Sequence, residues 1–301
     1  MKLTDTRDLY IQNLWNINLS ERTISNYNKE LGYFFDFLST ISIETITDIK
    51  SVHINMYIAH LVKKGNKAAT RTRKKSVLKK FFEYCIQMEL IEKDPSAVIG
   101  KIKVTDADKK KKEILTLKEQ EKVLKAIDKK STNKLKNICI FNLFIYCGIR
   151  VSELCGLLWE DIDFKSKLIT IRGKGRKTRK VPLVKEVESD LKQLKKEQTP
   201  RSEYIFTAKK TGLPMSDRNV RSIISRYCES AKISKNISPH RLRATAATSY
   251  LREGVNMRYI QMLLGHSTMS TTAIYLNPEE QEMNDAVQSA ARKIRKKGNK
   301  K

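Results

Sequence analysis

Apolar residues spaced three and four positions apart recur along most of this chain, and this spacing constrains its fold more than any other feature. Because an α-helix repeats every 3.6 residues, residues with this spacing share one helical face. In the first hundred residues no strand pattern interrupts it, and Asp94-Pro95 ends the last helix. The residues that carry the pattern are Leu9, Leu14, Trp15, Ile24, Tyr27, Leu31, Phe34, Phe35, Leu38, Val77, Leu78, Phe81, Phe82, Cys85 and Met88.

The length of 301 residues predicts two domains, each with its own core. The stretch KIKVTDADKKKK, residues 101–112, is polar and has no apolar period, so it reads as an exposed linker. We therefore expect an N-terminal helical domain over 1–99, a linker over 100–113 and a second domain over 114–301.

The second domain has a mixed pattern. Helical spacing resumes over 115–127 and 138–146, stops at Gly148 and restarts after Arg150. Two short alternating runs, 168–172 and 180–184, flank the glycine turn Gly173-Lys174-Gly175, which indicates a β-hairpin. The chain is thus predicted to be mainly α with a small β-sheet.

The C-terminal segment carries one more apolar helical pattern, followed by a basic tail. The last ten residues hold seven Lys or Arg and no acid, and we expect them to be disordered. The apolar positions of the preceding helix are Met283, Val287, Ala290, Ala291 and Ile294.

Charge limits the partners of the protein. The formal net charge of +27 repels itself unless a polyanion is near, and nucleic acid is the obvious candidate. We find no apolar run near 18 residues and no apolar segment after a basic start, so we expect a cytoplasmic protein without a membrane partner. The five cysteines lie in mostly apolar surroundings without a histidine at ligand spacing, and are predicted to be reduced core residues.

A dense basic stretch precedes the helix that carries Phe81. Residues 63–80 hold nine basic residues and no acidic one, in a pattern typical of a loop that leads into a helix N-terminus. A solvated helix face is the alternative, but the charge of the whole chain favours phosphate contacts. The candidate DNA-binding residues are Lys63, Lys64, Lys67, Arg71, Arg73, Lys74 and Lys75.

The order and spacing of six polar residues in the second domain carry more information than any one of them. Arg150 lies in GIRVSEL, Lys174 in the hairpin turn and His266 in LGHS; His240 and Arg243 form HRLR, and Tyr275 follows nine residues after His266. This set resembles the tyrosine recombinase (lambda-integrase-like) family, and within it the compact Xer-like and transposon-borne members.

The resemblance covers nearly the whole chain, although it is weaker in the first domain. There it rests on residues 68–96 with their FFEYC and DPSA elements, and it implies a core-binding domain that closes over DNA. Arg241 departs from the pattern, because many relatives carry Asp at this position of the H-x-x-R segment. The flanking His240 and Arg243 are nevertheless in place.

The chemistry of phosphodiester cleavage explains these residue types. Arginines hold phosphate oxygens bidentately, so Arg150 and Arg243 are the expected clamp. Tyr275 is the expected nucleophile, with His240 as the group that accepts its proton. The resemblance implies a 3′-phosphotyrosine intermediate, strand exchange through a Holliday junction, and neither metal nor other cofactor. Lys174 is the candidate general acid for the 5′-hydroxyl.

Two supporting roles complete the predicted site. His266 is expected to donate a hydrogen bond to a phosphate oxygen. Glu153 follows Arg150 by three residues, so it lies on the same helical side and is expected to orient the histidines or the arginine.

Alternatives remain for two of these residues. Lys177 and Lys180 share the hairpin with Lys174, and either is a rival for the general acid. Tyr250 and Tyr259 are rival nucleophiles, but both fall within apolar helical patterns and read as packing residues. The GKGRKT stretch lacks the spacing of a nucleotide-binding loop, so we do not expect ATP binding.

The predicted partners are double-stranded DNA with specific recombination sites and three further copies of this chain. The resemblance implies a homo-tetramer on synapsed DNA, with the C-terminal helix docked in trans, while a helix covering its own domain is the alternative. Accessory proteins are compatible with this activity. A type IB topoisomerase and a non-cutting DNA-binding regulator are the competing functions. Integration, excision and resolution of a mobile element or replicon dimer would all use this site, and the sequence does not choose among them.

Overall fold

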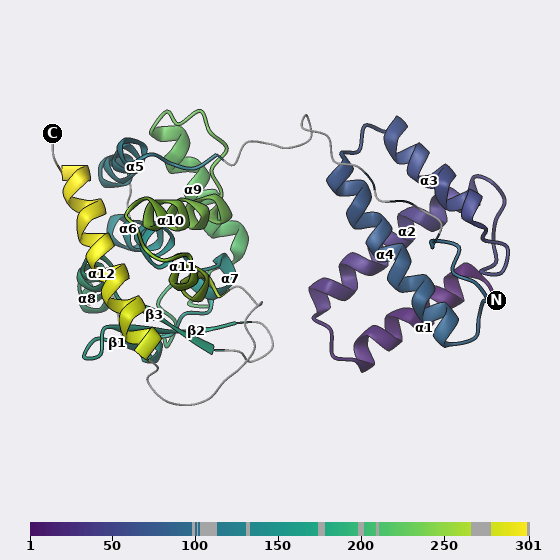
Figure 1. The fold of residues 1–301 in the computed structure, drawn as a ribbon, viewed down its shortest axis with the longest axis horizontal. Helices are drawn as coiled ribbons and strands as arrows, with labels where there is room; N and C mark the ends of the chain where they lie inside the picture. Colours follow the sequence, from purple (N-terminus) through teal and green to yellow (C-terminus); the bar gives the residue numbers. More distant parts are fainter. Residues whose placement is uncertain are drawn as a thin grey trace. The chain divides into compact units, whose positions relative to one another are not determined.

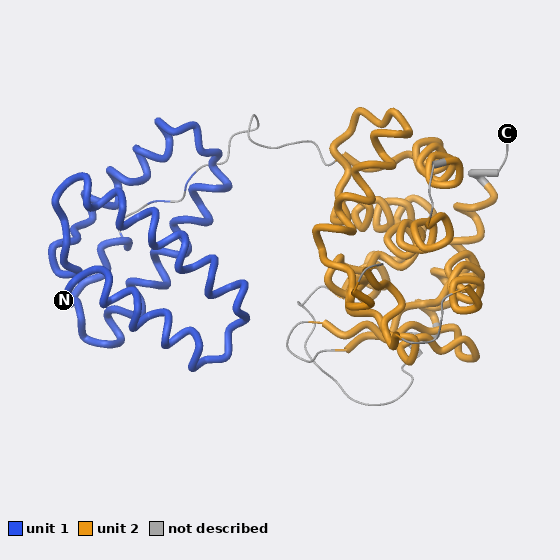
Figure 2. Tube along the Cα trace, turned by 180° about the vertical axis from the view of Figure 1, so that it is seen from behind, with its two compact units in different colours: residues 1–111 blue, residues 112–301 orange. Residues whose placement is uncertain are grey.

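The computed structural model consists of two compact units, residues 1–111 and 112–301 (Figure 2). The described residues are 1–97, 100, 102, 113–130, 133–173, 178–197, 202–208, 211–265 and 278–299, without the side chains of 130, 278–281 and 297–299. Most of the predicted linker therefore lies outside the described residues.

The first unit is a bundle of α-helices (Figure 1). Its core contains aromatic rings from different helices. The Phe34 ring, for example, packs edge-on against the Phe82 ring, and its centre lies 5.0 Å from the centre of the Tyr57 ring. Residues 40–50 form a loop instead of a helix. Within this loop, Thr45 forms an isolated antiparallel β-bridge with Lys2 at the N-terminus. The helices are α1 (Leu3–Asn16), α2 (Glu21–Ser39), α3 (Ser51–Lys63) and α4 (Ala68–Gln87).

The apolar pattern of α1 does not mark its buried face correctly. Leu14 is buried, but Leu9 and Trp15 are exposed, and Leu3 and Tyr10 take the core positions instead. Spacing alone does not say which of two adjacent apolar residues faces the neighbouring helix.

The second unit combines helices with a small antiparallel sheet (Figure 1). Its helical elements before the sheet are α5 (Leu117–Lys130), α6 (Lys134–Asn142), the π-helix η2 (Leu143–Cys147), α7 (Val151–Cys155) and the short 3₁₀-helix η3 (Trp159–Asp161). After the sheet come α8 (Lys185–Glu197), α9 (Asp217–Ser230), α10 (Pro239–Arg252), α11 (Met257–Leu264) and α12 (Pro278–Asn299).

The sheet has the strand order β1–β2–β3, with β1 at Ile162–Asp163, β2 at Leu168–Arg172 and β3 at Thr178–Pro182. The predicted hairpin is thus present, but β3 begins two residues earlier than expected and a third strand joins its edge. The register pairs Ile169 with Val181 and Ile171 with Arg179. Because side chains alternate along a strand, Arg179 lies on the same face as the buried Val181.

The core of the second unit includes the last helix. Met283, Val287 and Ile294 of α12 are buried in it, and α12 packs against α5, α10, α11 and β3 of its own unit. The expectation of a disordered tail is wrong for residues 292–299, because α12 continues to Asn299. Packing of its apolar face offsets the repulsion among the basic residues.

All five cysteines are free and buried, as expected for core residues. Of the helices that the structure describes, none combines the length and the apolar character that a membrane-spanning segment requires.

Candidate active site

The turn after the π-helix η2 is the foundation of the site. The chain leaves η2 at Gly148, whose φ of +58° is in the left-handed region. A Cβ atom here would lie 2.8 Å from Cδ2 of Leu264, so any other residue would strain the backbone and displace the Leu264 side chain. The turn therefore brings the following Arg150 close to the end of α11.

Arg150 and Glu153 are locked together at the start of α7. Arg150 is the N-cap residue, and its backbone N–H donates to Oε2 of Glu153 at 2.7 Å. Its Nη1 also donates to Oε1 of Glu153 at 2.7 Å, and its Nη2 donates to the carbonyl of Gly265 at 2.8 Å. The Arg150 side chain remains 42% exposed, so part of its guanidinium is accessible to a ligand.

Arg243 reaches the same place from α10. This helix begins with Ser238 as N-cap and Pro239 in its first turn, a combination that favours helix initiation. The guanidinium of Arg243 donates to the carbonyls of Gly148 and Leu264, so it joins the η2 turn to the end of α11. Burial lowers the pKa of Arg243, and repulsion from the neighbouring arginines lowers it further, to about 10. Because this value is still well above 7, Arg243 is charged at neutral pH.

A third arginine, Arg179 of β3, completes the cluster and was not predicted. Its Nη1 and Nη2 donate to the two carboxylate oxygens of Glu153 at 2.7 and 2.8 Å, and its Nε donates to the carbonyl of Leu263 at 3.1 Å. The signal that could have found it is strand alternation, because Arg179 is two residues from the core residue Val181.

The electrostatics of the cluster favour an anion. Burial by itself raises the pKa of Glu153, but hydrogen bonds from Arg179 and Arg150 outweigh burial and lower it to about 2. With one carboxylate against three guanidinium groups, the formal charge of the cluster is +2. Guanidinium groups bind phosphate oxygens in a fixed bidentate geometry, so the cluster suits a phosphodiester.

His240 lies on the first turn of α10, three residues before Arg243, and its side chain is exposed. Residues three apart share a helical face, so His240 lies on the side of α10 that carries Arg243. The structure thus brings Arg150, Glu153 and Arg243 together and places His240 one turn away. Lys174, His266 and Tyr275 lie outside the described residues.

The rival residues have other positions. Tyr250 is fully buried, and its hydroxyl donates to the carbonyl of Tyr146 at 2.7 Å, so it is a packing residue as expected. Tyr259 packs against the core, and its hydroxyl donates to Glu282 of α12. Lys180 is exposed next to Arg179 on β3, while Lys177 lies outside the described residues.

The predicted DNA-binding residues of the first unit are not equivalent. Lys63, Lys64 and Lys67 are exposed where α3 ends and α4 begins. Lys74 is buried, and its amine pairs with Glu30 and lies 4.6 Å from the centre of the Tyr33 ring.

The other α4 residues of that group differ from Lys74. Arg73 also pairs with Glu30 but keeps 55% of its side chain exposed. Arg71 and Lys75 are partly buried, and Lys75 donates to the carbonyl of Gly100 at 3.0 Å.

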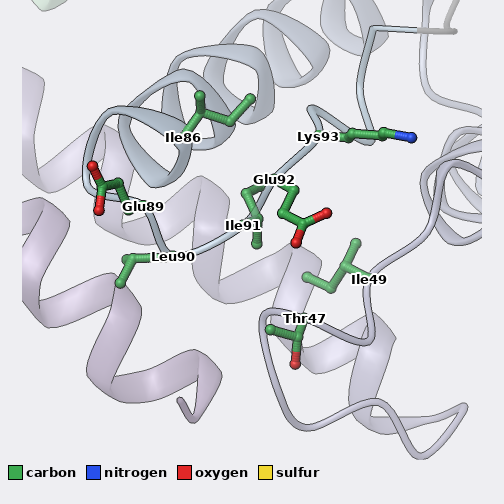
Figure 3. A pocket seen from close by; sticks show the side chains of 8 residues that line it. All are labelled: Thr47, Ile49, Ile86, Glu89, Leu90, Ile91, Glu92 and Lys93. Carbon is green, nitrogen blue, oxygen red and sulfur yellow. The ribbon is translucent and has the colours of Figure 1, made fainter.

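An open pocket in the first unit does not have the character of this site (Figure 3). Its lining combines the charged Glu89, Glu92 and Lys93 with apolar residues such as Ile49 and Leu90, and no arginine or histidine is among the lining residues. The candidate active site is therefore the arginine cluster of the second unit.

Comparisons with known proteins cover most of the chain. The phage integrase family model matches residues 113–282, and the phage integrase N-terminal SAM-like domain matches residues 8–89. The tyrosine recombinase XerC of Thermodesulfovibrio yellowstonii is 35% identical over 287 residues, which are 91% of this chain and 92% of that protein. A tyrosine recombinase of Pseudothermotoga lettingae is also 35% identical, over 89% of this chain and 92% of that protein.

Solved structures share the fold. A lambda integrase dimer bound to a COC′ core site has a TM-score of 0.73 at 22% identity, covering 92% of this chain and 100% of that one. The Tn1549 transposon integrase in complex with circular intermediate DNA has a TM-score of 0.75 at 22% identity, covering 94% of this chain and 99% of that one. A lambda integrase tetramer bound to a Holliday junction has a TM-score of 0.73 at 20% identity, covering 91% and 81%.

The two family models, the curated relatives and the fold of a helical bundle followed by an α+β unit place this protein among the integrase-type enzymes that transfer DNA strands. The chain belongs to the phage integrase family, whose relatives here are tyrosine recombinases, and the predicted family and fold class are confirmed.

Proposed function

We propose that this chain is a site-specific recombinase that cleaves and rejoins DNA through a covalent bond between Tyr275 and a 3′-phosphate. The observation that carries the proposal is the cluster of Arg150, Arg179 and Arg243 around one carboxylate, because its net positive charge matches the charge that develops on a phosphodiester during transesterification.

Arg150 and Arg243 differ in how far their guanidinium groups are exposed to solvent. Arg150 presents part of its guanidinium to solvent, whereas Arg243 is buried and uses two N–H groups on backbone carbonyls. A guanidinium has five N–H donors, so both arginines retain donors for the non-bridging phosphate oxygens. These contacts stabilise the five-coordinate phosphorus and lower the barrier to attack by the phenol of Tyr275.

Proton transfers complete the reaction. Attack by the phenol forms the P–O bond to Tyr275 and breaks the P–O bond to the 5′ oxygen. His240 accepts the phenolic proton, Lys174 donates a proton to the departing 5′ oxygen, and His266 donates a hydrogen bond to phosphate. Religation reverses these steps with a different 5′-hydroxyl, so the bond energy is conserved without ATP.

Binding to the duplex involves both units. The exposed lysines at the start of α4 suit phosphate contacts, and we infer that the helical unit, residues 1–99, is the core-binding domain. In the second unit, α9 exposes Arg218, Arg221 and Arg226 with no acid between them, and Arg218 and Arg226 lie on the face opposite its buried Val220 and Ile224. This face is a further candidate for DNA contact.

The functional assembly that we infer is a tetramer on two synapsed sites, acting in the cytoplasm where its DNA substrate is found. The apolar face of α12 fits a groove formed by α5, α10 and α11, and the same groove exists on every protomer. An exchange of α12 between protomers preserves each contact, which makes docking in trans a low-cost route to assembly.

The first experiment is an adduct assay with nicked duplexes made from DNA that flanks the gene, followed by denaturing electrophoresis and peptide mapping. The wild-type protein should form a covalent adduct on Tyr275, and Tyr275→Phe should bind the same DNA but form none. Tyr259→Phe is the matched control and should retain the adduct. Tight binding by the wild type without any adduct would favour the non-cutting regulator.

The general acid is tested with a duplex whose 5′ leaving oxygen is replaced by sulfur, because a thiolate leaves without protonation. Lys174→Ala should cleave normal DNA slowly and the sulfur-containing duplex at close to the wild-type rate. Lys177→Ala and Lys180→Ala are the controls, and rescue of one of these instead of Lys174→Ala would reassign the acid.

A further inference from the structure

Three consecutive carbonyl groups at the end of α11, those of residues 263–265, each accept a hydrogen bond from a different arginine. The donors are Arg179 of β3, Arg243 of α10 and Arg150 at the start of α7. A helix C-terminus carries partial negative charge on its unpaired carbonyls, so cations stabilise it there. The arginines therefore fix the end of α11 against three other elements.

Arg179 differs from the other two in what it contacts. Its side chain is only 15% exposed, and its guanidinium is shared between both oxygens of Glu153 and the α11 carbonyl. A carboxylate has about four acceptor positions. Arg179 uses two of those on Glu153, and the backbone N–H and Nη1 of Arg150 use the other two.

We infer that Arg179 is a positioning residue that sets how strongly Glu153 holds Arg150. With half of the acceptors of Glu153 taken by Arg179, Arg150 contacts Glu153 through one guanidinium nitrogen and the Gly265 carbonyl through another, and it keeps its remaining N–H groups for phosphate. Without Arg179, Glu153 is free to bind Arg150 bidentately and to neutralise its charge, and the formal charge of the cluster falls from +2 to +1.

Gly265 shows how closely Arg179 is fitted into this place. A Cβ atom on Gly265 would lie 2.9 Å from Cδ and 3.0 Å from Nε of Arg179. The glycine is thus needed for the backbone at the end of α11 to lie directly against the Arg179 side chain. A residue that only filled space would need neither the close approach of the Gly265 backbone nor the three hydrogen bonds that Arg179 donates.

The inference rests on the proposed function and is tested first by the rate of adduct formation. Arg179→Met removes the charge but keeps a long apolar stem, and it should slow adduct formation about 30-fold while DNA affinity changes less than about threefold. Arg179→Lys should have an intermediate rate, because a single amine cannot reproduce the planar fork.

The double variant Glu153→Gln/Arg179→Met separates positioning from simple structural support. Removing the carboxylate frees Arg150, so the double variant should form adduct about tenfold faster than Arg179→Met alone. A purely structural role predicts that the second substitution makes the enzyme slower. Arg252→Met, which replaces an exposed arginine in the last turn of α10, is the matched control and should stay near the wild-type rate.

Folding is checked by circular dichroism and by thermal unfolding of each variant. If Arg179→Met does not fold, Arg179→Lys and the double variant are compared with the wild type, since one keeps the charge and the other removes the buried carboxylate that has lost one of its two arginine partners. An Arg179→Met protein as fast as the wild type, or a double variant slower than Arg179→Met, overturns the inference.

A carboxyl NMR titration of Glu153 distinguishes failure of this inference from failure of the proposed function. Loss of Arg179 should raise the pKa of Glu153 clearly, because burial is then opposed by Arg150 alone. A wild-type protein without adduct would overturn the proposed recombinase, whereas an unchanged titration in folded Arg179→Met would overturn the role of Arg179 whatever the activity.

Discussion

At the scale of single residues, Glu153 links the stability of the protein to its catalytic cluster. Its pKa of about 2 in the folded protein lies below the ordinary value near 4.5 of an unfolded chain. The unfolded state therefore binds the proton more readily, and the contribution of Glu153 to stability is present above about pH 4.5 and is lost as the pH falls toward 2.

Glu153→Gln should accordingly lower the free energy of unfolding by about 2 kcal/mol at neutral pH, allowing for some solvent screening, and by much less near pH 3. Urea unfolding of both proteins across this pH range measures the difference. Glu160→Gln is the control, because the Glu160 side chain is 68% exposed in its pairing with Arg172 and should change stability little at any pH. A constant difference between wild type and Glu153→Gln would contradict the assigned pKa.

The sequence identified most of the described part of the site and missed one member. Arg150 and Arg243 were predicted because the GIRVSEL and HRLR segments resemble those of a known family, and Glu153 because it follows Arg150 by three residues and so shares its helical side. Arg179 was missed because residues 174–180 hold five basic residues, and a charge run does not show which one turns inward. Lys74 is the reverse case, since nothing in its basic surroundings predicts that Glu30 of another helix buries its amine.

At the scale of secondary-structure elements, the turn at Gly148 determines where both clamp arginines lie. Gly148→Ala should lower the free energy of unfolding by about 1–3 kcal/mol, through the positive φ and the contact with Leu264, and should also slow adduct formation. Gly32→Ala is the matched control. Gly32 lies within α2 with open space around it, so alanine there should raise stability by about 0.5–1 kcal/mol. Equal effects of the two substitutions on unfolding would refute this account.

The junction of α3 and α4 gives a second test at this scale. Replacing Lys63, Lys64 and Lys67 by Gln should weaken DNA binding and reduce the slope of log affinity against log salt by about 0.9 for each phosphate that is no longer neutralised. Lys74→Gln should instead leave the slope unchanged and lower stability by about 1–3 kcal/mol, because the buried Glu30 carboxylate loses its amine partner and keeps only Arg73. Binding measured by fluorescence anisotropy across a salt series separates the two. A reduced slope in Lys74→Gln would return Lys74 to the DNA interface.

The hairpin and α12 show which features of an element its sequence pattern predicts and which it does not. Alternation around a glycine turn predicted the β2–β3 hairpin, but not β1, because two residues are too short to establish a period. The apolar spacing of α12 predicted a helix with one buried face. The spacing cannot show whether this face covers its own protomer or a neighbouring one, because the groove has the same residues on every protomer.

At the scale of the whole molecule, mixing two inactive proteins tests whether α12 acts between protomers. One protein ends after Asn277 and so keeps Tyr275 but lacks α12; the other is full-length Tyr275→Phe. If α12 docks in trans, the full-length protomer supplies it to the open groove of the truncated one, and the mixture should form an adduct on the truncated chain only. The two sizes are resolved on a denaturing gel.

Each component of this mixture has its own control. The truncated protein alone should bind DNA yet form little adduct, because its groove between α5, α10 and α11 is empty. Adding Val287→Asp to the Tyr275→Phe protomer places a charge on the buried face of α12 and should abolish the rescue. An adduct formed by the truncated protein alone would mean that α12 is dispensable for cleavage. No adduct in the mixture, with both proteins bound to the DNA, would mean that α12 serves its own protomer and that the tetramer is held by other surfaces.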